Sequence, residues 1–236
     1  MQIETIESFK EYLIYTESLN SLGNQITLFR GQCDDNSLLP SIARSNPKLN
    51  TTRIEVEMLL EFRRRSHLLL NKDIINDWDL LVYAQHYGLK TRLLDWTSNP
   101  LIALWFACKN EFMLEKNAFI YILKGDESML VDVNKDLSPF KGNKTKILRP
   151  VLNNDRIVAQ SGWFTAHKYS DKTNSFVGLE KNVEVKKKII KLIIPASGKI
   201  EILKKLAAFG TNNRTIFPDI HGLCAHMNWI YRDKLK

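Results

Sequence analysis

The stretch Leu81–Cys108 reads LVYAQHYGLKTRLLDWTSNPLIALWFAC, and the fold of the chain depends on it. Apolar residues at helical spacing lead up to Gly88, which is typical of the position just after a helix end. Leu89–Trp96 then has short, extended character. Asn99 followed by Pro100 predicts the start of a second helix, an N-cap with proline in the first turn. We therefore expect a helix, a tight turn, a strand and a second helix in this order.

Polar side chains lie among residues of this stretch that look buried: Gln85, His86, Arg92, Asp95 and Thr97. Buried polar groups need partners, so this cluster predicts a shared network that either fixes the fold or lines a site. Asp95 is expected to accept hydrogen bonds in a largely buried network, from Arg92 or from backbone amides at the following helix start. The structural alternative is that Asp95 and Arg92 brace a loop and His86 caps a helix end.

The length of 236 residues allows one large domain or two small ones, and 44% hydrophobic residues is enough for a core. No repeat or linker forces a boundary, so we expect a single α+β domain over residues 1–236. No apolar run is long enough for a membrane span, and the N-terminus does not resemble a signal peptide. The scattered cysteines Cys33, Cys108 and Cys224 fit free thiols in a reducing cytosol. These observations predict a cytoplasmic protein.

The net charge of +8 favours a polyanionic partner, such as nucleic acid or an acidic protein. The excess is concentrated in Arg63–Arg65, Lys141–Lys146 and Lys186–Lys188. Each run can also be an ordinary solvated face of a basic protein. The charge therefore favours nucleic acid without excluding the simpler interpretation.

Hydrophobic periodicity and turn residues predict further elements on both sides of the central stretch. The expected helices are Ile6–Leu19 within an N-terminal segment (1–25), Thr52–Leu70 opened by a capping box at Thr52–Glu55, Asp77–Tyr87, a helix capped by Ser197 that runs to Phe209, and Pro218–Tyr231. The expected extended segments are Ile26–Gly31, Ala118–Leu123, Arg156–Lys168 and Ile189–Ile194. The polar segment 125–150 is expected to be a long, partly disordered excursion.

Several common catalytic motifs are absent from the sequence. His221 and His226 have no Glu or Cys at zinc-binding spacing, so we expect no metal site. No Walker loop follows a strand, and no serine-hydrolase elbow occurs. Paired carboxylates in one motif are absent as well, because Asp95 stands alone in its motif.

Three segments together resemble the FRG domain family, which is named for a Phe-Arg-Gly near its start. They are FRGQ at Phe29–Gln32, AQHYGLKTRLLDWTSNPLIALWFA at Ala84–Ala107 and RIVAQSGWF at Arg156–Phe164. The resemblance extends from about Leu28 to His226, so it implies a single FRG-type domain over most of the chain.

The order of these motifs, with polar residues at strand ends, also resembles the ADP-ribosyltransferase fold. That resemblance implies a split, mixed β-sheet flanked by helices, with NAD+ as substrate. In the arginine-type branch, an arginine on the first strand holds the dinucleotide, a Ser/Thr-rich strand end orders the site, and a late glutamate grips the nicotinamide ribose. Carried over to this chain, the resemblance implies catalytic roles for Arg30, Asp95 and Gln160. It implies NAD-binding roles for Arg30, Gly31, Gln32, His86, Thr97, Ser98 and Phe164.

Gln160 departs from the family pattern because it stands where an acidic residue is expected. Glutamine can bond a ribose hydroxyl but cannot offset developing positive charge. Either another acid such as Asp95 or Asp155 enters the site, or catalysis is weak, or the fold only binds a ligand. Two hypotheses follow.

The first hypothesis is an ADP-ribosyltransferase toxin of a bacterial toxin–antitoxin or phage-defence system. Its acceptor would be nucleic acid (RNA or DNA) or protein, and an antitoxin protein is its implied partner. The second hypothesis is a non-catalytic module that binds a nucleotide or nucleic acid in the same cleft.

Overall fold

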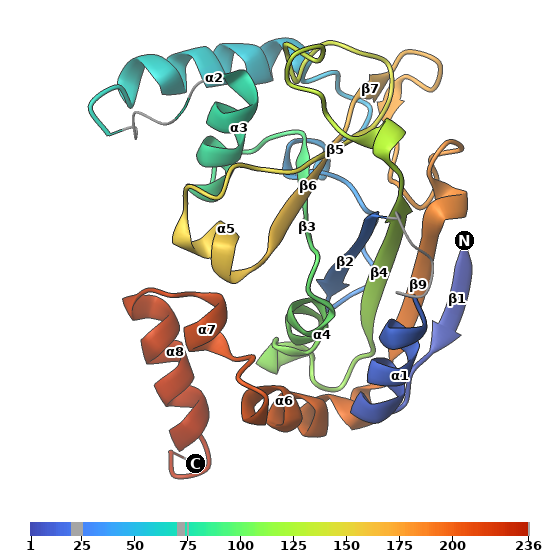
Figure 1. The fold of residues 1–236 in the computed structure, drawn as a ribbon, viewed down its shortest axis with the longest axis vertical. Coiled ribbons are helices and arrows are strands. Elements are labelled where there is room, and N and C mark those ends of the chain that lie inside the picture. The colour runs from blue at the N-terminus through green and yellow to red at the C-terminus, as the bar shows by residue number, and fades with distance from the viewer. Residues whose placement is uncertain (20–25, 70–73, 75, 236) are drawn as a thin grey trace.

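The computed structural model describes residues 1–19, 26–69, 74 and 76–235, and it has an α+β architecture (Figure 1). The strands are β1 (Gln2–Thr5), β2 (Ile26–Gln32), β3 (Leu93–Thr97), β4 (Ala118–Gly125), β5 (Lys146–Leu148), β6 (Gly162–Ala166), β7 (Tyr169–Ser170), β8 (Ser175–Phe176) and β9 (Ile189–Ile194). The α-helices are α1 (Phe9–Leu19), α2 (Thr52–Arg65), α3 (Asp77–His86), α4 (Pro100–Cys108), α5 (Asp155–Ala159), α6 (Lys199–Ala208), α7 (Asn213–Ile216) and α8 (Ile220–Tyr231). Short 3-10 turns lie at Ser41–Ala43, Glu111–Met113, Glu127–Met129, Lys186–Lys188 and Ala196–Gly198.

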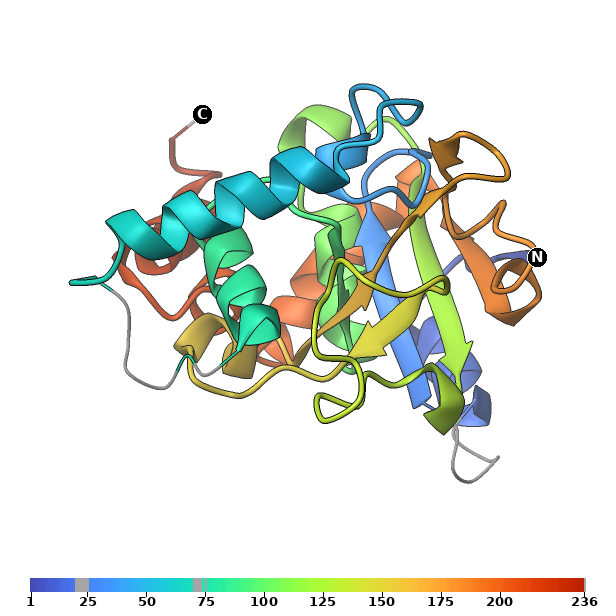
Figure 2. The same cartoon turned by 90° about the horizontal axis from the view of Figure 1, so that it is seen from above.

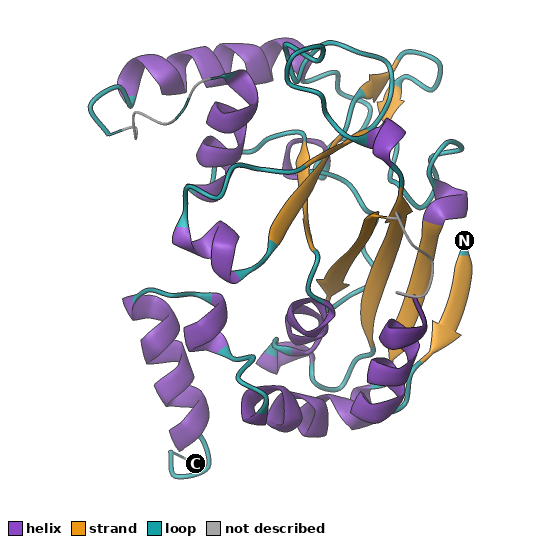
Figure 3. Ribbon diagram, viewed as in Figure 1, coloured by secondary structure: helices purple, strands orange, loops and turns teal. Residues whose placement is uncertain are grey.

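A seven-stranded mixed sheet runs through the molecule in the order β1-β9-β4-β2-β3-β6-β5. β1 is parallel to β9, and the other neighbours are antiparallel. β2 pairs with β4 along its whole length, but it pairs with β3 only at Phe29 and Thr97. The sheet therefore splits between β2 and β3, because β3 lies apart from β2 along the residues that precede Thr97 (Figure 3).

The two faces of the sheet bury different residues, as the alternation of side chains along a strand requires. On β4, Ile120 and Ile122 belong to the core packed against α1, α4 and α6, whereas Tyr121 and Leu123 belong to the core on the opposite face. A third core joins α2 and α3 to β3 and β6. Figure 2 shows α2 and α3 beside the β3–β6 half of the sheet. Both halves of the split sheet are thus anchored by their own helices.

The central stretch folds as its sequence predicts. Gly88 follows α3 with a φ of +94°, which favours glycine. The Asn99 side chain accepts a hydrogen bond from the Leu101 amide at 2.9 Å, and Pro100 begins α4. Gly88 fixes the turn before β3, and the Asn99–Pro100 cap fixes the direction of α4. Both features lie beside the split in the sheet.

The predicted capping box at Thr52–Glu55 is wrong, because Glu55 turns into the core. The residue before α2 is Thr51, and its side chain makes no capping bond. Glu55 accepts hydrogen bonds from the Arg92 amide at 2.6 Å and from Arg92 Nε at 2.8 Å, and both side chains are almost completely buried. Arg92 also donates to the Pro139 carbonyl at 3.2 Å. Arg92 therefore ties β3 to α2 instead of serving a site.

Other differences lie at element boundaries. α1 begins at Phe9, later than expected, and residues 20–25 lie outside the described residues. α2 ends at Arg65, before the predicted end at Leu70, which also lies outside them. α6 begins at Lys199 after a 3-10 turn and without a side-chain cap, so Ser197 does not cap it.

Several elements were not predicted: β1, β5, α5, β7, β8 and α7. The expected extended segment from Arg156 begins instead as the short helix α5, whose N-cap Asn154 accepts from the Arg156 amide at 2.9 Å. The strand β1 was also not predicted. It is an edge strand whose partner β9 lies at the far end of the chain.

The polar segment 125–150 contains a 3-10 turn and β5. It is attached to the body of the protein by the Trp78 indole, which donates to the Asp136 carbonyl at 2.6 Å. The Phe140 ring lies under the Arg92 guanidinium at 4.8 Å. The greater mobility expected for this segment stays a prediction.

Candidate functional site

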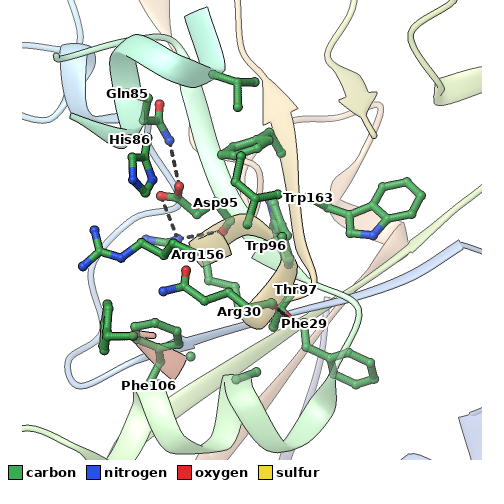
Figure 4. Close-up of a pocket in the computed structure, with 18 residues that line it drawn as sticks. Phe29, Arg30, Gln85, His86, Asp95, Trp96, Thr97, Phe106, Arg156 and Trp163 are labelled. Carbon is green, nitrogen blue, oxygen red and sulfur yellow. Dashed lines mark hydrogen bonds and ion pairs between the residues drawn. The ribbon is translucent and has the colours of Figure 1, made fainter. Parts of the chain in front are cut away.

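A cavity of about 350 Å³ lies where the sheet splits between β2 and β3. Its aromatic walls are Phe29, Trp96, Phe106, Trp163, Phe164 and Phe217. Its polar lining consists of Arg30, Gln85, His86, Asp95, Thr97, Arg156 and Gln160. Figure 4 shows that the polar side chains of Arg30, Gln85, His86, Asp95 and Arg156 lie close together, although they come from β2, α3, β3 and α5. An aromatic cleft with a few convergent polar groups is typical of a small-molecule site.

Arg30 extends from β2 across the split to β3. Its Nη1 donates to the Asp95 carbonyl at 2.7 Å and lies 3.8 Å from the Asp95 carboxylate, and its Nε donates to Gln32 Oε1 at 3.0 Å. Burial lowers the pKa of Arg30, while Asp95 opposes that shift. The predicted arginine at the end of a strand is therefore at the cavity, but part of its guanidinium already binds the protein.

Asp95 does not lie in the buried network that the sequence predicted. Its side chain is 62% exposed at the edge of the cavity, and its Oδ1 accepts from Gln85 Nε2 at 2.8 Å. Arg92 pairs with Glu55 instead. The reason is the alternation along β3, which turns Asp95 away from its buried neighbours Leu94 and Trp96. Asp95 is the one carboxylate among the described residues that line the cavity.

Thr97 and Gln160 both line the cavity, and a hydrogen bond joins the Thr97 side chain to the Gln160 backbone. The Thr97 hydroxyl donates to the Gln160 carbonyl at 2.7 Å and accepts from the Asn99 amide at 3.0 Å. The Gln160 side chain donates to the Ile216 carbonyl at 3.3 Å. Thr97 thus fixes the end of α5 against β3, while Gln160 connects that end to α7.

Gly31 lines the cavity, but its position has a packing reason. A Cβ atom on Gly31 would lie 1.9 Å from the Ala103 carbonyl oxygen, so α4 can approach β2 only because this residue is glycine. Of the other predicted NAD-binding residues, His86 and Phe164 line the cavity.

Ser98 does not line this cavity, and Gln32 lines a neighbouring cavity that shares Arg30 with it. Their NAD-binding roles stay predictions. Gln32 holds Arg30 and donates to the Asn36 carbonyl at 2.9 Å. Ser98 is exposed, and its amide donates to the Ser161 carbonyl at 3.1 Å. Gln32 comes directly after Gly31, and Ser98 comes directly after Thr97, which are the last residues of β2 and β3 that line the cavity.

His86 stands at the end of α3. Burial lowers its pKa, the charge of Arg156 lowers it further, and Asp219 opposes both effects. The imidazole is therefore biased towards its neutral form, which can both donate and accept a hydrogen bond.

The sequence prediction missed Arg156, Phe106 and Phe217 as lining residues. Arg156 begins the RIVAQSGWF motif, and Phe106 is the next-to-last residue of the motif at Ala84–Ala107, so both had a signal in the sequence. Phe217 follows α7 with no motif around it, and it reaches the cavity only through the tertiary fold.

A second cavity of about 450 Å³ adjoins the first and shares Arg30, Gly31 and Phe106 with it. Its own lining includes Cys33, Asp34, Asn36, Ser37 and Arg44. A ligand longer than the first cavity can therefore continue past Arg30 into a polar compartment.

The basic runs of the sequence are partly neutralised on the surface. Glu61 pairs with Arg64 and Arg65, and Asp77 pairs with Arg63. Lys188 pairs with Asp126. These runs therefore give less support to a nucleic-acid surface than the composition did.

No group of His, Cys, Asp or Glu suited to holding a metal ion occurs in the described part of the chain. Among the described helices, none has the length and apolar character needed to cross a membrane. The cysteines Cys33, Cys108 and Cys224 are free thiols.

Comparison with protein families places this geometry in context. The family model for the FRG domain matches residues 25–116, which include Arg30, Gly31, His86, Asp95 and Thr97 but not the segment that carries Arg156 and Gln160. Comparison with curated proteins and with solved structures gave no match. One wall of the cavity therefore comes from the segment that matches the FRG model, and the other wall comes from residues that follow this segment in the chain. Over residues 25–116, this chain is similar to the FRG domain family.

Proposed function

We propose that the cavity binds NAD+ and that the protein transfers ADP-ribose to an acceptor. The observation that carries this proposal is the convergence of Arg30, Asp95 and Gln160 on one aromatic-walled cavity at a split in the sheet. The order of the three motifs resembles that of the ADP-ribosyltransferase fold, and this resemblance supports the same assignment.

In the proposed reaction, the bond between C1′ of the ribose and the nicotinamide nitrogen breaks, and its electron pair leaves with nicotinamide. The acceptor's nucleophilic atom forms a new bond to C1′ and loses its proton to solvent. The transition state carries oxocarbenium-like positive charge, which a nearby carboxylate stabilises. Asp95 is suited to this role because its carboxylate is exposed to the cavity, whereas Asp155 does not line it.

The remaining residues have binding roles in this proposal. Arg30 would contact the phosphates or the adjoining ribose, since a guanidinium fork suits both. Gln160 would bond a ribose hydroxyl. The second cavity beyond Arg30 gives a dinucleotide room to extend, because the first cavity is near the lower end of ligand-pocket volumes, roughly 300–1,000 Å³.

The setting proposed for this activity is a toxin of a bacterial toxin–antitoxin or phage-defence system, acting in the cytoplasm on a nucleic acid or a protein. The alternative is a module that binds a nucleotide or nucleic acid without catalysis, which the neutral Gln160 favours.

Incubation with NAD+ labelled in the adenylate part, with RNA, DNA and protein offered separately, distinguishes these functions. The proposal predicts label transferred to one acceptor together with release of nicotinamide. Binding of NAD+ without nicotinamide release would favour the non-catalytic module, and the absence of both would reject the proposal.

A further inference from the structure

Arg156 is a cation of the cavity whose side chain has no polar partner among the residues that the structure describes. Its Nε is buried, and the structure gives neither a hydrogen bond nor an ion pair to its guanidinium among the described residues. Its contact is with the face of the Phe217 ring, 4.5 Å from the guanidinium carbon. A buried charged donor without an acceptor is costly, so it points to an acceptor supplied by a ligand.

The acids near Arg156 do not neutralise it. Asp95 is engaged by Arg30 and Gln85. Asp219 lies near enough to influence His86, but its carboxylate caps α8 and accepts from the Gly222 amide at 2.8 Å. Lys109 is a like charge, and it stacks on the same Phe217 ring at 5.2 Å. This wall of the cavity is therefore positive.

Arg30 differs from Arg156 in this respect. Two of its nitrogens already donate to Gln32 and to the Asp95 carbonyl, and Asp95 offsets its charge. An anionic ligand would have to share Arg30 with these groups, whereas the guanidinium of Arg156 is free to bind it. Figure 4 shows the Arg156 side chain among the cavity-lining groups, below His86 in that view.

We infer that Arg156 is the principal phosphate-binding residue of this cavity. The inference rests on the proposed function, since it names the residue that would hold the phosphates of the same nucleotide. The planar fork is oriented in advance by stacking on Phe217, so little side-chain entropy is lost when a phosphate binds. Neutral His86 beside it can donate a second hydrogen bond.

Calorimetric titration with ADP and with adenosine tests this inference without requiring turnover. Wild-type protein should bind ADP more tightly than adenosine, and Arg156→Gln should reduce ADP affinity at least tenfold while leaving adenosine affinity unchanged. Arg156→Lys should restore only part of the loss, because an ammonium lacks the stacked fork. Arg149→Gln is the matched control, since exposed Arg149 stacks on Trp163 at 5.6 Å but does not line the cavity.

The inference is overturned if ADP binds Arg156→Gln as tightly as wild type, if Arg149→Gln loses as much affinity, or if wild-type protein does not bind ADP. A circular dichroism melt of each variant separates loss of binding from loss of fold. ADP binding that depends on Arg156, found together with no consumption of NAD+, would support this inference and reject ADP-ribose transfer. The two failures are thus distinguishable.

Discussion

Gly31 and Ala103 are in backbone contact, because a Cβ atom on Gly31 would lie 1.9 Å from the Ala103 carbonyl oxygen and 2.6 Å from the Ala107 amide. The contact sets the distance between β2 and α4. The glycine of the Phe-Arg-Gly motif therefore has a packing role beside an arginine that lines the cavity.

Gly31→Ala should destabilise the protein by about 2 kcal/mol or more, because the obstacle is helix backbone, which cannot move aside as a side chain can. Urea unfolding measures the loss. Gly162→Ala is the control, since a Cβ atom there meets its nearest neighbour at 3.5 Å, an ordinary contact. Equal stability losses in the two variants would contradict the packing role of Gly31.

The buried pair of Glu55 and Arg92 should be essential to the fold and not to ligand binding. Glu55→Gln should lower the free energy of unfolding by about 3 kcal/mol, because it leaves the buried Arg92 without its counter-charge. Glu57→Gln on the same helix should cost less than about 1 kcal/mol, because its pair with Arg53 is exposed. A Glu55→Gln variant as stable as Glu57→Gln would show that the buried pair is dispensable.

His167 should make stability depend on pH. It is buried, and burial followed by the charges of Arg30 and Arg92 lowers its pKa to about 3. The unfolded chain takes up the proton at a pKa of roughly 6.5, so the His167 contribution is complete above that pH and falls as the pH drops towards 3. The loss is about 1.4 kcal/mol per pH unit.

Denaturant unfolding at pH 7 and pH 5 tests this dependence. The difference in unfolding free energy between the two conditions should be smaller in His167→Gln than in wild type by about 2 kcal/mol. Glutamine keeps an acceptor for the Thr165 hydroxyl, which lies 3.1 Å from His167 Nε2. An unchanged pH dependence in the variant would mean that other groups cause it.

The polar segment 125–150 should exchange its amide protons faster than the central strand and helix around β3 and α4. Much of it lies outside regular structure, and few of its residues are buried. The exceptions should be the amides near Leu130 and Val131, whose segment bridges to Ile147, and those of β5 itself, which pairs with β6. Hydrogen exchange followed by mass spectrometry reports both, and uniformly slow exchange through Lys135–Lys146 would contradict the expectation.

Local signals predicted the elements whose ends are fixed by local chemistry. Asn99 and Pro100 begin α4, and Gly88 follows α3, because caps and turns need particular residue types at particular positions. β1 was not predicted because it forms a strand through its pairing with β9, a segment far away in the sequence. Its one apolar side chain, Ile3, is largely exposed and gives no pattern of burial. Glu55 fitted a capping box, but the buried guanidinium of Arg92 is a stronger partner than the end of a helix.

The candidate site was predictable from its motifs, although Gln160 follows helix α5 and does not end a strand. Arg30, Thr97 and Gln160 were expected together and do line one cavity. The environment of Asp95 was not predictable, because it depends on which face of β3 is turned towards the split in the sheet. Phe217 reaches the cavity through the packing of α7 against α5, a contact between segments far apart in the chain.

The initial rate of nicotinamide release from NAD+ by Asp95→Asn, with Asp155→Asn as the matched control, tests the central claim most directly. Asp95 is exposed, so the substitution should leave the fold intact while lowering turnover about 100-fold, because the transition-state charge loses its carboxylate. Asp155→Asn should match wild type, since Asp155 does not line the cavity. Equal rates in all three proteins, or no release by wild-type protein with any acceptor, would contradict the account.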